Sequence, residues 1–454
     1  MSANENNLRE NKLGTGSVRR LVLGMSFPAM LSMIISAMYN IVDAIFVGRI
    51  SYGALTAVTL VFPVQMFLVA LGVGTNIGLS SLIARRLGQK RQEDADSAAS
   101  HGFLIAIFNW LIFALFGLFL ADRFIGLFTD DPYIFANAII YCRIISIGSL
   151  FAFVSICCEK ILQATGNMVF PMIFNISGAV LNIVLAPIFI IGLFGAPRLE
   201  VMGAGLVAIT GQFVAMVLAL ILTFRFKHYV NIRLRGFRVD FSTLKDIYAV
   251  GVPTIIMMAI GSLMNTAFNK ILMDYSAAAV AVLGVYFRIN SFLFMPLFGL
   301  NQGSLPVIAY NYGARNKERL LLAYKTAVFI AVGIMAVGTA IFLLIPGQLI
   351  SLFNDAPEML AVGVPAMRII SICFVSAAFS IVTGALFQAL AHGTFTMLVA
   401  LVRQLLVAVP AMYIFLRLFG IDAAWASFPF AELFGLTMTI IFLRRIYIKE
   451  IRPL

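Results

Sequence analysis

A carboxylic acid interrupts the first long apolar stretch of the chain. In YNIVDAIFVG (39–48), Asn40 and Asp43 stand three residues apart, a spacing that places two side chains on one face of a helix. Burial disfavours the charged form of a carboxylate, so a buried Asp43 can exchange a proton or hold a cation. The alternative is an acid at a helix end that reaches the membrane surface. The apolar IFV that follows Asp43 favours the coupling interpretation.

The composition identifies the kind of protein that carries this acid. Of 454 residues, 61% are hydrophobic and 11% are charged, and the mean hydropathy is +1.00. Soluble domains carry about 25% charged residues, so the composition indicates a polytopic membrane protein. The net charge of +12 is explained by basic loops on the inner face of a membrane, and we predict no nucleic-acid partner.

Twelve apolar runs have the length that crosses a bilayer, about 20 residues each. Lipid cannot hydrogen-bond to a peptide group and the runs do not alternate in polarity, so we predict helices and exclude a barrel. The predicted spans are 21–47, 54–84, 98–121, 133–158, 169–193, 203–224, 246–273, 278–309, 321–346, 360–390, 395–418 and 423–443.

The positive charges orient these spans. The two tails and three of the connections on the same side carry 22 of the 32 Lys and Arg residues. Basic residues gather on the cytoplasmic side of membrane proteins, so both termini are predicted to be cytoplasmic. The acidic turns at 129–132 and 354–357 then face outward.

The chain repeats itself at an offset of 225 residues. RIISI occurs at 143–147 and again at 368–372, and the shift also relates Pro28 to Pro253 and Asn40 to Asn265. We predict an all-α integral membrane protein with two six-helix lobes, related by a pseudo-two-fold axis along the membrane normal. The N-lobe is residues 1–224, the inter-lobe loop is 225–245 and the C-lobe is 246–454.

Several other polar residues lie within predicted spans. Glu432 is a second functional candidate, whereas Glu159 adjoins Lys160 near a cytoplasmic helix end and is interpreted as lying at the membrane interface. We expect structural pairing for the in-span arginines, because long basic side chains reach partners or the surface. The predicted substrate cavity is lined by Gln65, Met258, Asn265, Arg288, Gln302 and Glu432.

No motif of a soluble enzyme occurs in the sequence. The dipeptide Gly-Lys is absent, and none of the three histidines is followed by Glu, which excludes Walker A and HExxH motifs. All four cysteines lie in apolar runs, so we predict no disulfide framework and no metal site. We expect no catalytic residue and no cofactor.

Three segments resemble the multidrug and toxic compound extrusion (MATE) family, in its bacterial multidrug-resistance branch. They are P28-x11-NIVDAIFVGR, SLIARRLGQKRQEDA (81–95) and RINSFLFMPLFGLNQGSLPVIAYNYGARNKER (288–319). The resemblance covers all twelve predicted spans. It implies a V-shaped pair of lobes in the bacterial inner membrane that exports amphipathic, mostly cationic drugs or dyes in exchange for H+ or Na+. We expect a monomer in the lipid bilayer.

The resemblance also assigns residues. Asp43 matches the acid of the first helix, and Pro28 matches the proline at which that helix bends. Where the family usually carries Asp, this chain has Ala186, four residues after Asn182. Asn40, Asn182 and Thr210 remain as oxygen ligands beside Asp43. The missing carboxylate favours H+ over Na+, since hard cations take several oxygen ligands.

Two alternatives stay open at this point. A flippase or exporter of lipid-linked or anionic molecules from the same wider superfamily is favoured slightly by the in-span arginines. An integral membrane enzyme requires clustered His, Asp or Ser at a membrane face, and the sequence shows no such cluster.

Overall fold

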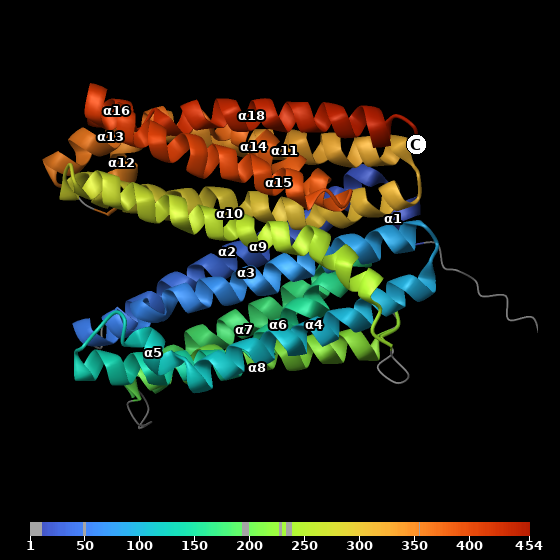
Figure 1. Ribbon diagram of the computed structural model, residues 1–454, viewed down its shortest axis with the longest axis horizontal. Helices are drawn as coiled ribbons and strands as arrows, with labels where there is room; N and C mark the ends of the chain where they lie inside the picture. Colours follow the sequence, from blue (N-terminus) through green and yellow to red (C-terminus); the bar gives the residue numbers. More distant parts are fainter. Residues whose placement is uncertain (1–10, 49–50, 193–198, 227–228, 233–237, 354) are drawn as a thin grey trace, which may run out of the picture.

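A computed structural model describes residues 11–48, 51–192, 199–226, 229–232, 238–353 and 355–454. Within these ranges the side chains of 39–45, 47–48, 52 and 191 are not described. The described residues contain helices and connecting turns but no strand. In Figure 1, α4 to α8 lie on one side and α11 to α18 on the other, with α2, α3, α9 and α10 between them.

The first half of the chain forms one lobe. The short α1 precedes six long helical segments, and the fifth of these ends in a π-helix, η1. The elements are α1 (Lys12–Thr15), α2 (Val18–Gly48), α3 (Tyr52–Gly88), α4 (Gln92–Phe119), α5 (Ala121–Ile125), α6 (Pro132–Ala164), α7 (Val169–Ala186), η1 (Pro187–Ile191) and α8 (Glu200–Arg225).

The second half forms the other lobe, with more interruptions. The elements are α9 (Phe241–Met273), α10 (Ala277–Gly313), α11 (Lys317–Leu344), α12 (Pro346–Ser351), α13 (Pro357–Ser371), α14 (Phe374–Ala389), α15 (Gly393–Ala400), η3 (Leu401–Ala408), α16 (Val409–Phe419), α17 (Ile421–Ala424), α18 (Ser427–Ile446) and η4 (Tyr447–Ile451).

The predicted spans are confirmed, with two internal irregularities. In the described part, 11 helices are long and apolar enough to cross a membrane, and the pair α13–α14 makes the twelfth. That pair bends by 50° between Ser371 and Phe374, so the predicted run 360–390 is broken rather than straight. The run 395–418 contains the π-helix η3 at its centre. π-Helices often mark functional sites or strained segments.

Equivalent residues begin equivalent helices in the two lobes. The Ser51 hydroxyl accepts a hydrogen bond from Ala54 N at 3.0 Å, which caps α3. Ser276, 225 residues later, caps α10 by accepting from Ala279 N at 3.1 Å. A serine at this position satisfies an amide that the first helical turn leaves free. The sequence repeat is therefore also a repeat of local structure.

Three pairs of equivalent glycines hold the lobes together. A Cβ added to Gly88 would lie 2.0 Å from Tyr310 O, and one added to Gly313 would lie 2.1 Å from Arg85 O. Since 85 and 310 differ by the same 225 residues as 88 and 313, the two contacts are related by the pseudo-two-fold axis. No side chain fits at either position, so the helix backbones touch.

The same relation recurs along the interface. Gly78 lies against Ile247 and Gly251, whereas its equivalent Gly303 lies against Ser26, the equivalent of Gly251. Further along, Gly74 contacts Ile255. Gly299, the equivalent of Gly74, contacts Met30, the equivalent of Ile255. Helices α2 and α10 therefore pack in the same way as α9 and α3, and the predicted pseudo-two-fold relation of the lobes is confirmed.

Polar contacts reinforce one end of this interface. We call the end that carries α1, Gly88, Gly313 and the C-terminus the basic end, and the end with Asp131 and Asp355 the acidic end (Figure 1). Near the basic end, Ser81 Oγ donates to Gln388 O at 2.7 Å, and Arg86 pairs with Asp246 at 3.0 Å. The lobes converge at this end and diverge toward the acidic end (Figure 1).

Candidate functional site

The predicted coupling acid lies on the continuous helix α2. Asp43 and Asn40 are near its C-terminal end, and their side chains lie outside the described residues. Their role therefore remains a prediction. What the structure does describe is the helix that carries them and the neighbouring helices α7 and α8.

Asn182 offers a free acceptor oxygen in the core of the N-lobe. Its side chain is 6% exposed, and Oδ1 is buried without a hydrogen-bond partner among the described residues. Gly211 of α8 makes room for this amide, since a Cβ there would lie 2.2 Å from Asn182 Nδ2. A buried acceptor without a partner is costly and occurs where a water, an ion or a functional group can fill the place.

The neighbours of Asn182 contribute differently. Thr210 precedes Gly211, is exposed, and donates its hydroxyl to Leu206 O at 2.7 Å, so its oxygen keeps acceptor capacity. Ala186 is 3% exposed, one helical turn beyond Asn182, and the π-helix η1 begins directly after it. The combination of an unpaired amide oxygen and a helix irregularity makes this part of the N-lobe the candidate ion site.

Pro28 lies where α2 meets the other lobe. It is buried in the interior of α2, and its neighbours Ala29 and Met30 contact Gly299 of α10. A proline removes one backbone hydrogen bond and weakens the helix at that point. The predicted hinge therefore lies next to an inter-lobe contact.

The six residues predicted to line a substrate cavity are distributed over both lobes. Gln65 donates to Tyr141 Oη at 3.0 Å within the N-lobe. Asn265 Oδ1 accepts a hydrogen bond from Asn269 Nδ2 on the same helix, α9. Met258 is half-buried on α9, and Arg288 is exposed on α10. Of the six, Gln302 alone lines one of two cavities of the described residues, a cavity between α2, α3, α6, α7 and α10.

Glu432 is buried inside the C-lobe and forms an ion pair with the partly buried Arg403. Its carboxylate is 3.0 Å from Arg403 Nη1 and accepts a hydrogen bond from Ser380 Oγ at 2.9 Å. Arg403 lies on the π-helix η3. The expected structural pairing is found for this arginine and for Arg143, which pairs with Asp122 at 2.9 Å. Glu432 thus has a structural partner that the sequence could not show.

We expect Glu432→Gln to destabilise the C-lobe by about 1–3 kcal/mol, because it leaves the partly buried Arg403 without its counter-charge. The double substitution Glu432→Gln/Arg403→Met should recover much of that loss. Thermal unfolding of the purified protein in detergent measures both. A double variant as unstable as Glu432→Gln alone would contradict the assignment of a paired structural role.

Glu159 and Lys160 are packed inside the protein near the C-terminal end of α6 rather than exposed on a surface. Their depth at the membrane interface stays a prediction. Their side chains are 14% and 4% exposed, and their charged atoms are 3.1 Å apart. Gln163 Nε2 donates to Glu159 Oε1 at 2.7 Å, and Asn175 Nδ2 donates to Oε2 at 3.0 Å. Lys160 in turn reaches Gln302 Oε1 of the C-lobe at 2.7 Å.

This cluster lines a cavity of about 230 Å³ between α2, α3, α6, α7 and α10. Its polar lining combines the ion pair with amide and hydroxyl groups, and methionines form much of the rest. The lining residues are Ala29, Ser32, Met33, Ser36, Val73, Ile156, Glu159, Lys160, Gln163, Met168, Pro171, Met172, Asn175 and Gln302. We call it the inner cavity.

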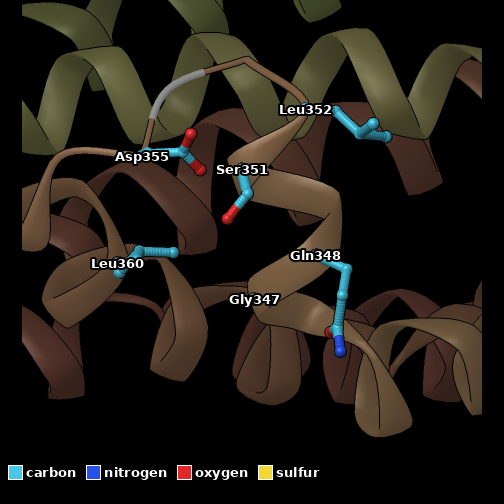
Figure 2. A pocket seen from close by; sticks show the side chains of 6 residues that line it. All are labelled: Gly347, Gln348, Ser351, Leu352, Asp355 and Leu360. Atoms are coloured by element: carbon cyan, nitrogen blue, oxygen red, sulfur yellow. The ribbon is translucent and has the colours of Figure 1, made fainter.

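A second, wide-open pocket of about 570 Å³ lies at the acidic end of the C-lobe. Figure 2 shows Gln348, Ser351 and Asp355 around it, on α12 and on the turn that leads to α13. The described residues of its lining include one carboxylate and no basic group. The pocket is remote from Asn182 in the other lobe, and we assign it no role in coupling.

Two parallel six-helix repeats, joined by backbone contacts and carrying buried polar groups in each lobe, define a polytopic membrane protein of the two-lobe class. The chain belongs to the MatE family, whose model matches residues 28–188 and 253–414. The two matched segments fall one in each lobe, which agrees with the internal repeat.

Similar proteins cover nearly the whole chain. The multidrug export protein MepA of Staphylococcus haemolyticus is 23% identical over 92% of this chain and 91% of its own length. MepA of Staphylococcus aureus is 25% identical, with 91% of each chain covered. A crystal structure of MATE in complex with MaL6 has a TM-score of 0.90 at 27% identity, covering 98% of this chain and 100% of the other.

A further similar structure is described as an outward-facing conformation of a multidrug resistance MATE family transporter. Its TM-score is 0.89 at 27% identity, and the alignment covers 96% of this chain and 97% of that one. The structural similarity therefore extends over both lobes and over the way in which they are joined.

Proposed function

We propose that the protein is a secondary active multidrug exporter that works by alternating access. It exchanges amphipathic, mostly cationic compounds for a cation. The family membership and the names of the MepA relatives support export of several drugs. The convergence of the lobes at the basic end supports rocking of one lobe against the other.

We also propose that the basic end faces the cytoplasm, in the inner membrane of a bacterium. Arg85, Arg86, Arg315 and Lys317 lie at this end, whereas Asp130 and Asp131 lie at the other. That asymmetry supports cytoplasmic termini. In this orientation the lobes are closed toward the cytoplasm, and the compound would leave on the outer side.

Coupling is assigned to Asp43, with Asn40, Asn182 and Thr210 as oxygen-bearing neighbours. The single observation that carries this assignment is the buried, unpaired Oδ1 of Asn182 on a helix that packs against α2. H+ is the proposed ion, because Ala186 supplies no oxygen where a second carboxylate would complete a Na+ site. Protonation of Asp43 would remove its charge and let α2 rearrange at Pro28.

Dye transport in proteoliposomes tests this function. The purified protein is reconstituted with a fluorescent cationic dye, and a pH gradient and a Na+ gradient are applied in separate experiments. Dye movement driven by the pH gradient alone supports proton antiport. Movement driven only by Na+ would overturn the choice of ion, and no movement under either gradient would overturn the proposed antiport.

We expect Ala186→Asp to leave proton-driven export intact and to add a Na+ dependence. The new carboxylate would lie one helical turn from Asn182 and supply oxygen ligands. Dye efflux under a pH gradient, with and without equal Na+ on both sides, measures the effect. Ala186→Asn, which adds an amide but no charge, is the matched control. An unchanged response to Na+ would contradict the proposed reason for H+ selectivity.

The alternative of a flippase or anion exporter loses part of its support. It rested on arginines within the spans, but Arg403 and Arg143 are neutralised by Glu432 and Asp122. A paired arginine presents little net positive charge to an anionic substrate. The remaining arginines do not by themselves define an anion site.

A further inference from the structure

The inner cavity brings together a buried pair of opposite charges and an apolar wall. Glu159 and Lys160 are the two charged residues among its lining residues, and they follow one another on α6. Because their charged atoms are 3.1 Å apart, the pair is compact and carries no net charge. Neither the proposed coupling at Asp43 nor the C-lobe pair uses these two residues.

The polar contacts of the pair surround both charges, and the Lys160 ammonium donates to Glu159, Gln163 and Gln302. Asn175 and Gln163 hold the Glu159 carboxylate from the side, and Lys160 donates to Gln163 Oε1 at 2.8 Å. Ser32 Oγ is buried and has no hydrogen-bond partner among the described residues, although its residue lines the cavity.

The apolar lining suits a small hydrophobic body. Met33, Met168 and Met172 contribute flexible thioether side chains that adapt to the shape of a ligand. The volume of 230 Å³ would hold about eight water molecules. That is below the range of roughly 300–1,000 Å³ typical of sites for drug-sized molecules, so the cavity suits one small molecule.

Charge balance selects the kind of molecule. A monocation that entered the cavity would leave one uncompensated positive charge in an environment of low dielectric constant, which is costly. A zwitterion adds no net charge. Its ammonium can bind Glu159 while its carboxylate binds Lys160, so that one ion pair becomes two.

We propose that the inner cavity is a substrate subsite for a small amphipathic zwitterion, with its ammonium and carboxylate close together on an apolar body. An aromatic α-amino acid has this chemistry. The proposal rests on the proposed function as an exporter, because it names a class of compound that the protein takes up on its basic side.

Access to this subsite is linked to the position of the lobes. Gln302 belongs to α10 of the C-lobe, and its Oε1 accepts hydrogen bonds from Lys160 at 2.7 Å and from Gln163 at 3.2 Å. When the lobes separate at the basic end, Gln302 leaves with the C-lobe. Lys160 then loses a partner and the inner cavity opens. A carboxylate of the ligand would replace the Gln302 oxygen at Lys160.

Binding of three matched probes to the purified full-length protein tests the proposal. L-Phenylalanine carries both charges, phenethylamine only the ammonium and 3-phenylpropionate only the carboxylate. Isothermal titration calorimetry should show that L-phenylalanine binds about tenfold more tightly than either analogue, which corresponds to about 1.4 kcal/mol. Equal or weaker binding of L-phenylalanine would overturn the proposal.

Two charge substitutions make the test specific. With Lys160→Gln, Glu159 remains without its counter-charge, and phenethylamine should become the preferred probe. With Glu159→Gln, Lys160 remains, and 3-phenylpropionate should become preferred. The double variant should bind L-phenylalanine no more tightly than the two analogues. Asp122→Asn, which removes an exposed charge elsewhere in the lobe, should keep the parent protein's preference for L-phenylalanine. A merely structural pair would weaken all three probes together, and that result would overturn the assignment.

Folding and coupling are separated by two further measurements. The double variant keeps the cavity neutral, and its thermal stability is compared with that of each single variant. A single variant that is much less stable than the double variant would have lost binding through unfolding. Asp43→Asn should retain the order of affinities for the three probes even though we expect it to lose transport. In the parent protein, failure of gradient-driven transport with intact zwitterion binding would overturn the proposed function and leave the subsite standing.

Discussion

Asp43→Asn should abolish gradient-driven export while leaving a folded protein that binds drug weakly. A membrane potential contributes ~2.3 kcal/mol per charge per 100 mV, and a tenfold proton gradient contributes about 1.4 kcal/mol. The exporter can use this energy only if the ion and the drug bias the same conformational equilibrium. Asparagine resembles the protonated acid permanently, so α2 would no longer respond to pH.

Dye efflux from cells or vesicles, normalised to the amount of protein in the membrane, measures this effect. The matched control is Asp422→Asn, a substitution of the same kind on the short helix α17 of the other lobe. If Asp43→Asn exported dye at a near-normal rate under a pH gradient, Asp43 would not be the coupling residue. The buried Glu432 would then be the next carboxylate to test.

Gly88→Ala and Gly313→Ala should each prevent the lobes from closing at the basic end. An added methyl group would lie 2.0 Å from Tyr310 O at Gly88 and 2.1 Å from Arg85 O at Gly313. These neighbours are backbone atoms, so they cannot move aside as a flexible side chain would. We expect a stability loss of about 1–3 kcal/mol and a population shift toward conformations with the lobes apart at this end.

Spin labels at Glu93 and Glu318, two exposed and equivalent positions on α4 and α11, report the separation of the lobes. Pulsed electron paramagnetic resonance should give longer distances in either glycine variant than in the parent protein. Gly284→Ala is the matched control, since it lies on the same helix as Gly313 and an added Cβ there meets nothing within 4 Å. Unchanged distances in both test variants would show that these contacts do not hold the basic end closed.

Apolar length and the 225-residue offset predicted the twelve spans and the two lobes, because both can be read from the sequence without knowledge of how the helices pack. A run such as 278–309 is long enough to span a membrane wherever it packs, and the cap at Ser276 follows from its own turn. The bend after Ser371 and the π-helix at 401–408 were not predicted. Neither break changes the apolar length of its run, so hydropathy does not report it.

The candidate site was predicted less completely, for the same reason. Two adjacent opposite charges near a helix end resemble a surface pair, and only the packing of α7 and α10 over Glu159 and Lys160 buries them. Position along a helix gives depth in the membrane, but it does not give the face that meets the other lobe. Gln302 and Glu432 both lie within spans of the C-lobe, yet Gln302 hydrogen-bonds to Lys160 of the N-lobe, whereas Glu432 pairs with Arg403 of its own lobe.

The backbone contacts at Gly88 and Gly313 also bear on how the two halves of such a chain can diverge after duplication. An interface in which a glycine of each half meets a main-chain oxygen of the other is self-complementary, as in a symmetric dimer. Because the contact is between backbone atoms, it does not depend on which side chains surround it. Glu159 and Lys160 in one half correspond to Gly384 and Ala385 in the other. A symmetric scaffold can therefore acquire chemistry in one half while the fit between the halves is preserved.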